Sequence, residues 1–207
     1  MVSIGICGAS GCGKSLLVKQ LASLNCSPAL FEGEVGTFPS AILRKIIDKS
    51  DPPGLFRWFV KQYTARLRVA KKLSEDGILC FVDGTRASVA AHQVLEQKRH
   101  SAVLTKIIAQ LKLDTDVVVL LTLSKNKYIS FIRKRGRETE QSKEYMRRSM
   151  AVQDEFLRLL ASKSKDDKKT NVLVINRDKL DFCNSADLDD INKKILRFAK
   201  SHEKSEN

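Results

Sequence analysis

Short apolar runs alternate with longer segments of mixed polarity along the chain. Between the runs, apolar residues recur every three or four positions, which is the spacing of an amphipathic helix. Strands alternating with helices in this way are typical of a parallel sheet covered on both faces. Five runs have the length and composition of strands: "VSIGIC" near the start, 28–35, 77–83, 115–123 and 171–176. The pattern therefore predicts an α/β fold with a five-stranded parallel sheet.

The segments between these runs predict the helices. Prolines and glycine in "SDPPG", residues 50–54, interrupt the second of them. Residues 161–170 read as a polar loop, and 201–207 as a frayed tail. Because neither an internal repeat nor a linker is visible, we expect one domain over 1–207. Helices are predicted over 14–24, 38–73, 87–111, 125–137, 142–160 and 186–200.

No apolar run approaches the length of a membrane helix, and the longest is "VVVLLTL" at 117–123. The N-terminus reads as a first strand and lacks the layout of a secretory signal. We therefore expect a cytoplasmic protein without membrane contact. Five cysteines without metal-binding spacing fit reduced structural thiols better than disulfides or a zinc site.

A formal net charge of +13 favours an anionic partner, either a nucleic acid or a smaller polyanion such as a nucleotide. Lysines and arginines are scattered along the whole chain, so an excess of lysine on solvated helices explains the charge equally well. Aromatic residues do not interleave with basic ones as they do in single-strand-binding proteins. Nucleic acid is therefore the less favoured partner.

A phosphate-binding loop follows the first predicted strand. The stretch "GASGCGKS" fits G-x-x-x-x-G-K-[ST] at every fixed position and stands between a strand and an amphipathic helix. Backbone N–H groups of such a loop wrap phosphate oxygens, the lysine reaches the β- and γ-phosphates of ATP, and the final hydroxyl ligates Mg²⁺. The predicted cofactor-binding residues are Gly8, Ala9, Ser10, Gly11, Cys12, Gly13, Lys14 and Ser15. Because no guanine-reading N-K-x-D motif is present, a nucleoside or nucleotide kinase is the leading class.

The stretch "FIRKRGRETEQ", followed by "EYMRRSMAVQDEFL", resembles the lid and following helix of the deoxyribonucleoside kinase family. The resemblance covers residues 2–24 and about 113–200, and it implies a P-loop kinase fold with an arginine-rich lid over about 133–143. It implies that Arg135 and Arg137 balance charge on the transferred phosphoryl group and that Glu140 holds the sugar hydroxyl. "NVLVINRDKLDF" resembles the family's last strand and adenine-side loop, with Asp181 and Phe182 at its end. A homodimer is implied by the resemblance alone.

The acceptor side matches this family less well. A carboxylate after the second strand serves as general base in the family, and either Glu32 or Glu34 offers one here, although no proline follows them. In "VDGTR", Asp83 keeps an acidic position suited to Mg²⁺ or its water shell, whereas Gly84 stands where the family has arginine and Arg86 offers a substitute.

The family's spacing of a glutamine seven residues before an arginine is lost, because Phe59 precedes Arg66 at that distance. Arg66 is still a candidate for acceptor binding. Trp58 either lines the acceptor pocket or belongs to the core.

The middle of the chain also resembles thymidylate kinase, in "DGTRASVAAHQ" and "GTFPSAILRKII". The favoured function is a deoxynucleoside kinase that uses ATP and Mg²⁺. Thymidylate (dTMP) kinase or another nucleoside monophosphate kinase is the alternative, with Arg44 and Arg66 available for the acceptor phosphate. A nucleic-acid-binding P-loop ATPase is the third.

Overall fold

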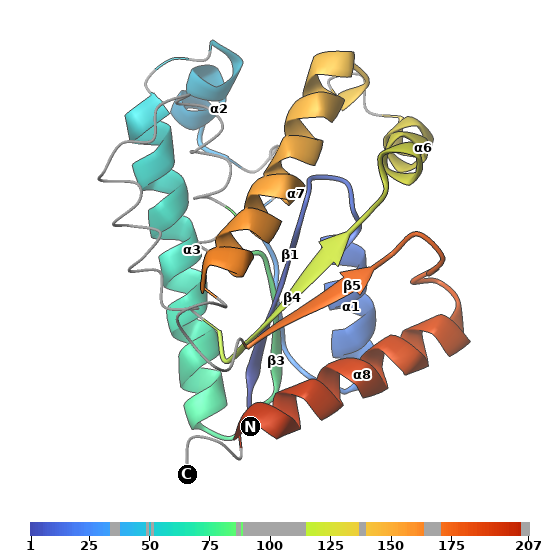
Figure 1. Cartoon of the computed structure of the whole chain (residues 1–207). Helices are drawn as coiled ribbons and strands as arrows, with labels where there is room; N and C mark the ends of the chain where they lie inside the picture. The colour runs from blue at the N-terminus through green and yellow to red at the C-terminus, as the bar shows by residue number, and fades with distance from the viewer. Residues whose placement is uncertain are drawn as a thin grey trace.

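The computed structural model describes residues 1–33, 38–48, 50, 52–85, 88, 115–136, 140–163 and 171–203. Its centre is a five-stranded sheet in the order β2-β3-β1-β4-β5, in which all neighbouring strands are parallel (Figure 1). The predicted five-stranded α/β fold is thus confirmed. The strands are β1 (Ser3–Gly8), β2 (Ala29–Leu30), β3 (Cys80–Asp83), β4 (Val117–Thr122) and β5 (Val172–Asn176).

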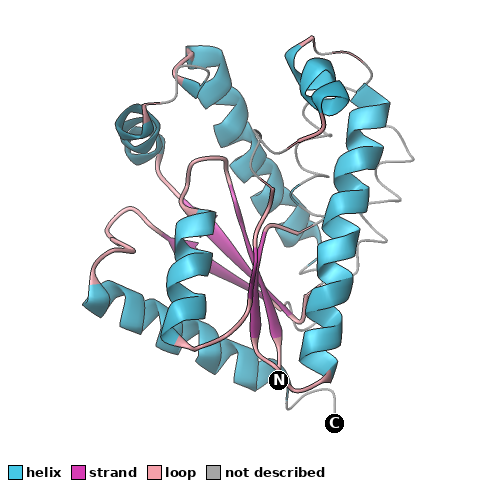
Figure 2. Ribbon diagram, turned by 180° about the vertical axis from the view of Figure 1, so that it is seen from behind, coloured by secondary structure: helices cyan, strands magenta, loops and turns pink. Residues whose placement is uncertain are grey.

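Helices lie on both faces of this sheet, as Figure 2 shows from behind. Alternation along a strand sends neighbouring side chains to opposite faces. In β3, Phe81 packs into the cluster that includes α1 and α8, while Cys80 and Val82 pack against α3. The helices are α1 (Lys14–Leu24), α2 (Ser40–Ile47), α3 (Pro52–Glu75), α6 (Lys125–Arg135), α7 (Lys143–Lys163) and α8 (Ser185–Glu203).

The central strands β1, β3 and β4 are buried almost completely, which is why their sequences are apolar throughout. Their carboxyl ends lie at one edge of the sheet, because all strands run in the same direction. Gly8 at the end of β1, Asp83 at the end of β3 and Thr122 at the end of β4 therefore face one region. In open α/β sheets, ligands bind in the crevice at that edge.

Some predicted boundaries differ from the observed ones. Strand β2 includes Ala29 and Leu30 of the predicted 28–35, the two residues that pair with β3, and residues 34 and 35 lie outside the described residues. The break predicted at 50–54 is real, but Pro52 already begins α3, where a missing N–H costs nothing. Helix α8 continues to Glu203 and so includes the first three residues of the predicted tail. The predicted helix over 87–111 lies almost entirely outside the described residues.

Within the described part of the chain, none of the helices combines the length and the apolar character needed to cross a membrane.

Candidate active site

The loop between β1 and α1 has the backbone of a phosphate cradle. Gly8, Gly11 and Gly13 all have positive φ angles, of 148°, 81° and 92°, which residues with side chains rarely adopt. The loop ends at the N-terminus of α1, where unpaired N–H groups and the helix dipole favour an anion. The motif predicted for residues 8–15 therefore takes the conformation that phosphate binding requires.

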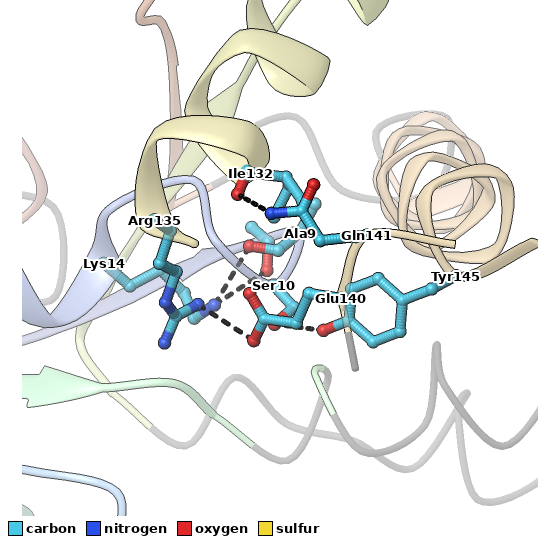
Figure 3. Close-up of polar contacts among 9 residues, drawn as sticks. Ala9, Ser10, Lys14, Ile132, Arg135, Glu140, Gln141 and Tyr145 are labelled. Carbon is cyan, nitrogen blue, oxygen red and sulfur yellow. Dashed lines mark hydrogen bonds and ion pairs between the residues drawn. The ribbon is translucent and has the colours of Figure 1, made fainter. Parts of the chain in front are cut away.

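Lys14 lies folded over this loop. Its Nζ donates hydrogen bonds to the carbonyls of Gly8, at 3.2 Å, and Ala9, at 3.1 Å (Figure 3). Burial by itself lowers the pKa of Lys14, but Cys12, Asp83 and Glu32 oppose it and the net pKa is raised. Burial also raises the pKa of Cys12, so its thiol is neutral near pH 7, where Asp83 and Glu32 are the groups that act on Lys14.

Ser15 and Asp83 form a pair of oxygen ligands beside the loop. Ser15 Oγ donates to Asp83 Oδ2 at 2.5 Å, and Asp83 is only 2% exposed. Its Oδ1 is buried and has no hydrogen-bond partner among the described residues. A buried carboxylate oxygen beside a hydroxyl suits Mg²⁺, which takes few protein ligands and fills its other positions with phosphate oxygens and water. No cluster of three or more His, Cys, Asp or Glu suited to a metal occurs in the described part of the chain.

The predicted lid begins where α6 ends. Gly136 has a φ of 71°, and its N–H bonds to the carbonyls of Ile132 and Arg133, which closes the helix. Arg135 Nη1 lies 3.3 Å from Glu140 Oε1, and the Glu140 side chain is buried. In Figure 3, the side chains of Arg135, from α6, and Lys14, from the phosphate loop, extend into the same region. Two cations that meet there are suited to a group with several negative charges.

The helices on either side of the predicted lid also contact the phosphate loop directly. A Cβ built on Gly11 would lie 2.4 Å from Ile132 Cδ1, so α6 packs on the bare backbone of the loop. The hydroxyl of Tyr145, from α7, donates to Ser10 Oγ at 2.9 Å (Figure 3). The loop is thus held between α6 and α7, and Arg135 is placed above it.

A second cluster joins β2, α3 and β3 on the side predicted to bind the acceptor. Tyr63 Oη donates to Glu32 Oε1 at 2.8 Å, and Arg66 Nη1 donates to the carbonyl of Asp83 at 3.1 Å. The Arg66 guanidinium lies 4.3 Å from the centre of the Tyr63 ring. Burial, followed by the charge of Glu32, raises the pKa of Tyr63 well above its ordinary value, so its hydroxyl stays a donor.

Tyr63 was not anticipated from the sequence. The hint in the sequence is that Tyr63 and Arg66 are three residues apart, so they share one face of α3. Gly84, with a φ of 77°, leaves room for the ring, since a Cβ there would lie 2.9 Å from Tyr63 Cε1. Gly84 thus accommodates an aromatic side chain.

Trp58 belongs to an aromatic cluster one turn earlier on α3. Its ring centre lies 5.0 Å from those of Phe38 and Phe59, in edge-on arrangements. All three side chains are partly exposed. The cluster is therefore neither fully in the core nor free in solvent.

On the opposite side of the loop, Asp181 and Phe182 lie in a turn after β5. The backbone N–H of Cys183 donates to Asp181 Oδ1 at 3.0 Å, and Phe182 is completely buried. Phe182 stacks on Arg177, another residue that sequence reasoning missed. Three predicted site residues, Glu34, Arg86 and Arg137, lie outside the described residues.

No protein-family model matches the sequence, and no curated protein matches it at a significant level. Solved structures do match. One is deoxyadenosine kinase from M. mycoides with products dCMP and dCDP bound, with a TM-score of 0.71 at 20% identity over 94% of this chain and 99% of that chain. The same enzyme with bound dATP gives a TM-score of 0.67 at 20% identity over the same shares of the two chains.

Thymidylate kinase from Candida albicans gives a TM-score of 0.63 at 16% identity, over 98% of this chain and 92% of that chain. The two enzymes are similar to this chain along nearly its whole length. The chain therefore has the fold of the P-loop nucleoside and nucleotide kinases.

Proposed function

We propose that the protein is an ATP-dependent kinase that transfers the γ-phosphoryl group to the 5′-hydroxyl of a deoxynucleoside, giving a dNMP and ADP. The observation that carries this proposal is the convergence of Lys14 and Arg135 above the phosphate loop, with Glu32 acting electrostatically on Lys14 from the acceptor side. Cations that gather where charge develops, and a carboxylate beside them, are what phosphoryl transfer to a hydroxyl requires.

In the proposed reaction, the acceptor oxygen forms a bond to the γ-phosphorus while the bond from that phosphorus to the β–γ bridging oxygen breaks. Glu32 takes the hydroxyl proton, and ADP leaves with the bridging oxygen. Tyr63 orients the Glu32 carboxylate, while Lys14 and Arg135 balance the charge of the phosphoryl group. Glu34 is the alternative base, and Arg137 is a second lid cation of this proposal.

Mg²⁺ and the remaining site residues complete the proposal. Ser15 and Asp83 would hold the ion, which would offset the negative charge of the phosphates. Asp181 and Phe182 are assigned to the adenine side, Glu140 to the sugar hydroxyl, and Trp58, Arg66 and Arg86 to the acceptor. The similarity to an enzyme that acts on deoxynucleosides supports this assignment.

One observation favours a second function, the phosphorylation of dTMP or another nucleoside monophosphate. The guanidinium of Arg66 lies on the acceptor side next to the end of β3, where it would suit an acceptor phosphate. The similarity to a thymidylate kinase supports this alternative. The proposal also includes a cytoplasmic location, which fits the free cysteines of the described chain. It further includes a homodimer.

The test is ADP release by the purified protein with ATP, Mg²⁺ and each of four deoxynucleosides or dTMP. Turnover with a deoxynucleoside supports the first function, and turnover with dTMP alone supports the second. A folded protein that turns over none of the five acceptors would overturn the kinase proposal. Stimulation of ATP hydrolysis by DNA or RNA, lost at higher salt, would instead favour a nucleic-acid-dependent ATPase.

A further inference from the structure

Arg177 is a buried cation next to the phosphate loop, and the mechanism above gives it no role. It directly follows β5 and is only 7% exposed. Its backbone N–H donates to the carbonyl of Thr122 at 2.9 Å, which fixes it beside the end of β4. Arginine is rarely this buried unless its charge is compensated, so its surroundings indicate what it is for.

Two aromatic rings enclose the guanidinium. Its Cζ lies 4.4 Å from the ring centre of Phe131, on α6, and 4.0 Å from that of Phe182. A planar cation between aromatic faces is stabilised electrostatically and has little freedom to move. Burial lowers the pKa of Arg177, but arginine starts so far above neutrality that it stays charged.

The guanidinium points at the phosphate loop. Arg177 Nη1 donates to the carbonyl oxygen of Cys12, and a Cβ built on Gly13 would lie 1.9 Å from the same nitrogen. Gly13 therefore has two reasons to be glycine: its φ of 92° and the space that Arg177 occupies. The Arg177 side chain and the loop fit together only when residue 13 is glycine, which has no Cβ.

The carbonyl of Cys12 and the N–H of Gly13 belong to one trans peptide group, and they point in opposite directions across its plane. A cation that holds the carbonyl fixes the orientation of the N–H on the other side. It also polarises the peptide, which makes that N–H a stronger donor.

We propose that Arg177 is a positioning residue for the nucleotide phosphates, acting through the peptide between Cys12 and Gly13. This inference rests on the proposed binding of ATP or ADP at the phosphate loop. Because Phe131 belongs to the same helix as Arg135, the arginine also ties the loop to the base of the lid. It does not touch the acceptor cluster at Glu32 and Tyr63.

The test compares wild type with R177M and R177K by titration calorimetry with Mg²⁺-ADP and by steady-state kinetics. R177M removes the charge and the donor, so we expect ADP affinity to fall about 10- to 100-fold, the loss typical of a charged hydrogen bond. We expect KM for ATP to rise in parallel while KM for the acceptor stays within about twofold. R177K restores a cation and should recover part of the ADP affinity. R158M removes an exposed arginine on α7 and serves as the matched control.

A purely structural role would lower the affinities for ADP and acceptor by the same factor, and that result would overturn the inference. So would an unchanged ADP affinity in folded R177M. If R177M does not fold, R177Q keeps an amide donor without charge and carries the same expectation. Wild-type protein that binds no ADP would overturn the proposed function as well, which separates the two failures.

Discussion

Tyr63 contacts every part of the acceptor cluster. Its hydroxyl holds Glu32, its ring supports Arg66, and its edge fills the space above Gly84. The contact with Glu32 requires the oxygen atom, whereas the other two are also made by carbon atoms of the ring. The hydroxyl can therefore be removed without disturbing the packing of the ring.

Y63F is expected to lower kcat about three- to tenfold, since one neutral hydrogen bond contributes roughly 0.5–1.5 kcal/mol. KM for ATP should not change, because the proposed adenine side, at Asp181 and Phe182, is on the opposite side of the phosphate loop from Tyr63. Steady-state kinetics with both substrates varied checks this. An unchanged kcat would mean that Tyr63 does not orient the base.

Arg135 can be tested against a neighbour on the same helix end. R135A should lower kcat about a hundredfold or more, because it removes a cation from the region above the phosphate loop. The thermal midpoint should fall by only a few degrees, because the arginine side chain is 35% exposed, but by more than for an unpaired surface arginine, because its partner Glu140 is buried.

R133A is the control, because Arg133 is exposed in the same last turn of α6 and has no proposed role. It should leave both quantities unchanged. If R135A lost activity only in proportion to its loss of stability, Arg135 would have a structural role at the helix end and no role in catalysis.

Site residues differ in how far the sequence predicts them. Lys14, Ser15 and Asp83 could be predicted, since a local motif or a strand end fixes each. Tyr63 and Arg177 could not. Their partners lie 31 and 165 residues away in the chain, and only the folded sheet brings them together.

At the level of elements, the contact that matters most for the site is the packing of α6 on the phosphate loop. Gly11 and Ile132 are far apart in the sequence, and the loop backbone approaches the Ile132 side chain closely. Any side chain at position 11 must displace the end of the Ile132 side chain, and the φ of 81° at this position adds strain.

G11A is therefore expected to raise KM for ATP at least tenfold. I132V removes the Cδ1 atom that the new methyl group would meet, so the double variant should recover several-fold of the loss. The coupling is read from a double-mutant cycle on kcat/KM for ATP. Additive effects would show that α6 and the loop act independently.

Element types were predictable because hydrophobic period and length agree for each central strand and helix. The boundaries were less so. The strand predicted at 77–83 starts only at Cys80, because Ile78 is 41% exposed and lies before the point where β1 offers a partner. Pairing, which is a property of the whole sheet, decides where a strand begins.

At the scale of the whole molecule, buried cysteine thiols and tyrosine hydroxyls make the folding stability depend on pH in the alkaline range. Burial raises the pKa of Cys80 from 9.0 to about 11 and that of Tyr128 from 10.0 to about 12, and it also raises the pKa values of Cys7, Cys12 and Tyr63. The folded protein keeps these protons at a pH where the unfolded chain has lost them. Stability must therefore fall as pH rises above about 9.

The thermal midpoint is expected to stay level from pH 7 to 8.5 and to decline steadily up to pH 11. Each such group contributes a slope of about 1.4 kcal/mol per pH unit between its unfolded and folded pKa values. C80A should flatten the decline between pH 9 and 11, whereas C26A, at an exposed cysteine, should not. A midpoint that does not change with pH would contradict the assignment.

The edge-on packing of Trp58 with Phe38 and Phe59 has an optical consequence. Trp58 is the single tryptophan of the sequence, and it lies on the helix that carries Tyr63 and Arg66. Its fluorescence should respond to an acceptor far more than to ADP, and W58F should abolish the signal. An equal response to both ligands would place the aromatic cluster outside the acceptor site. The protein thus carries its own probe for identifying the acceptor, without a label and before any turnover is measured.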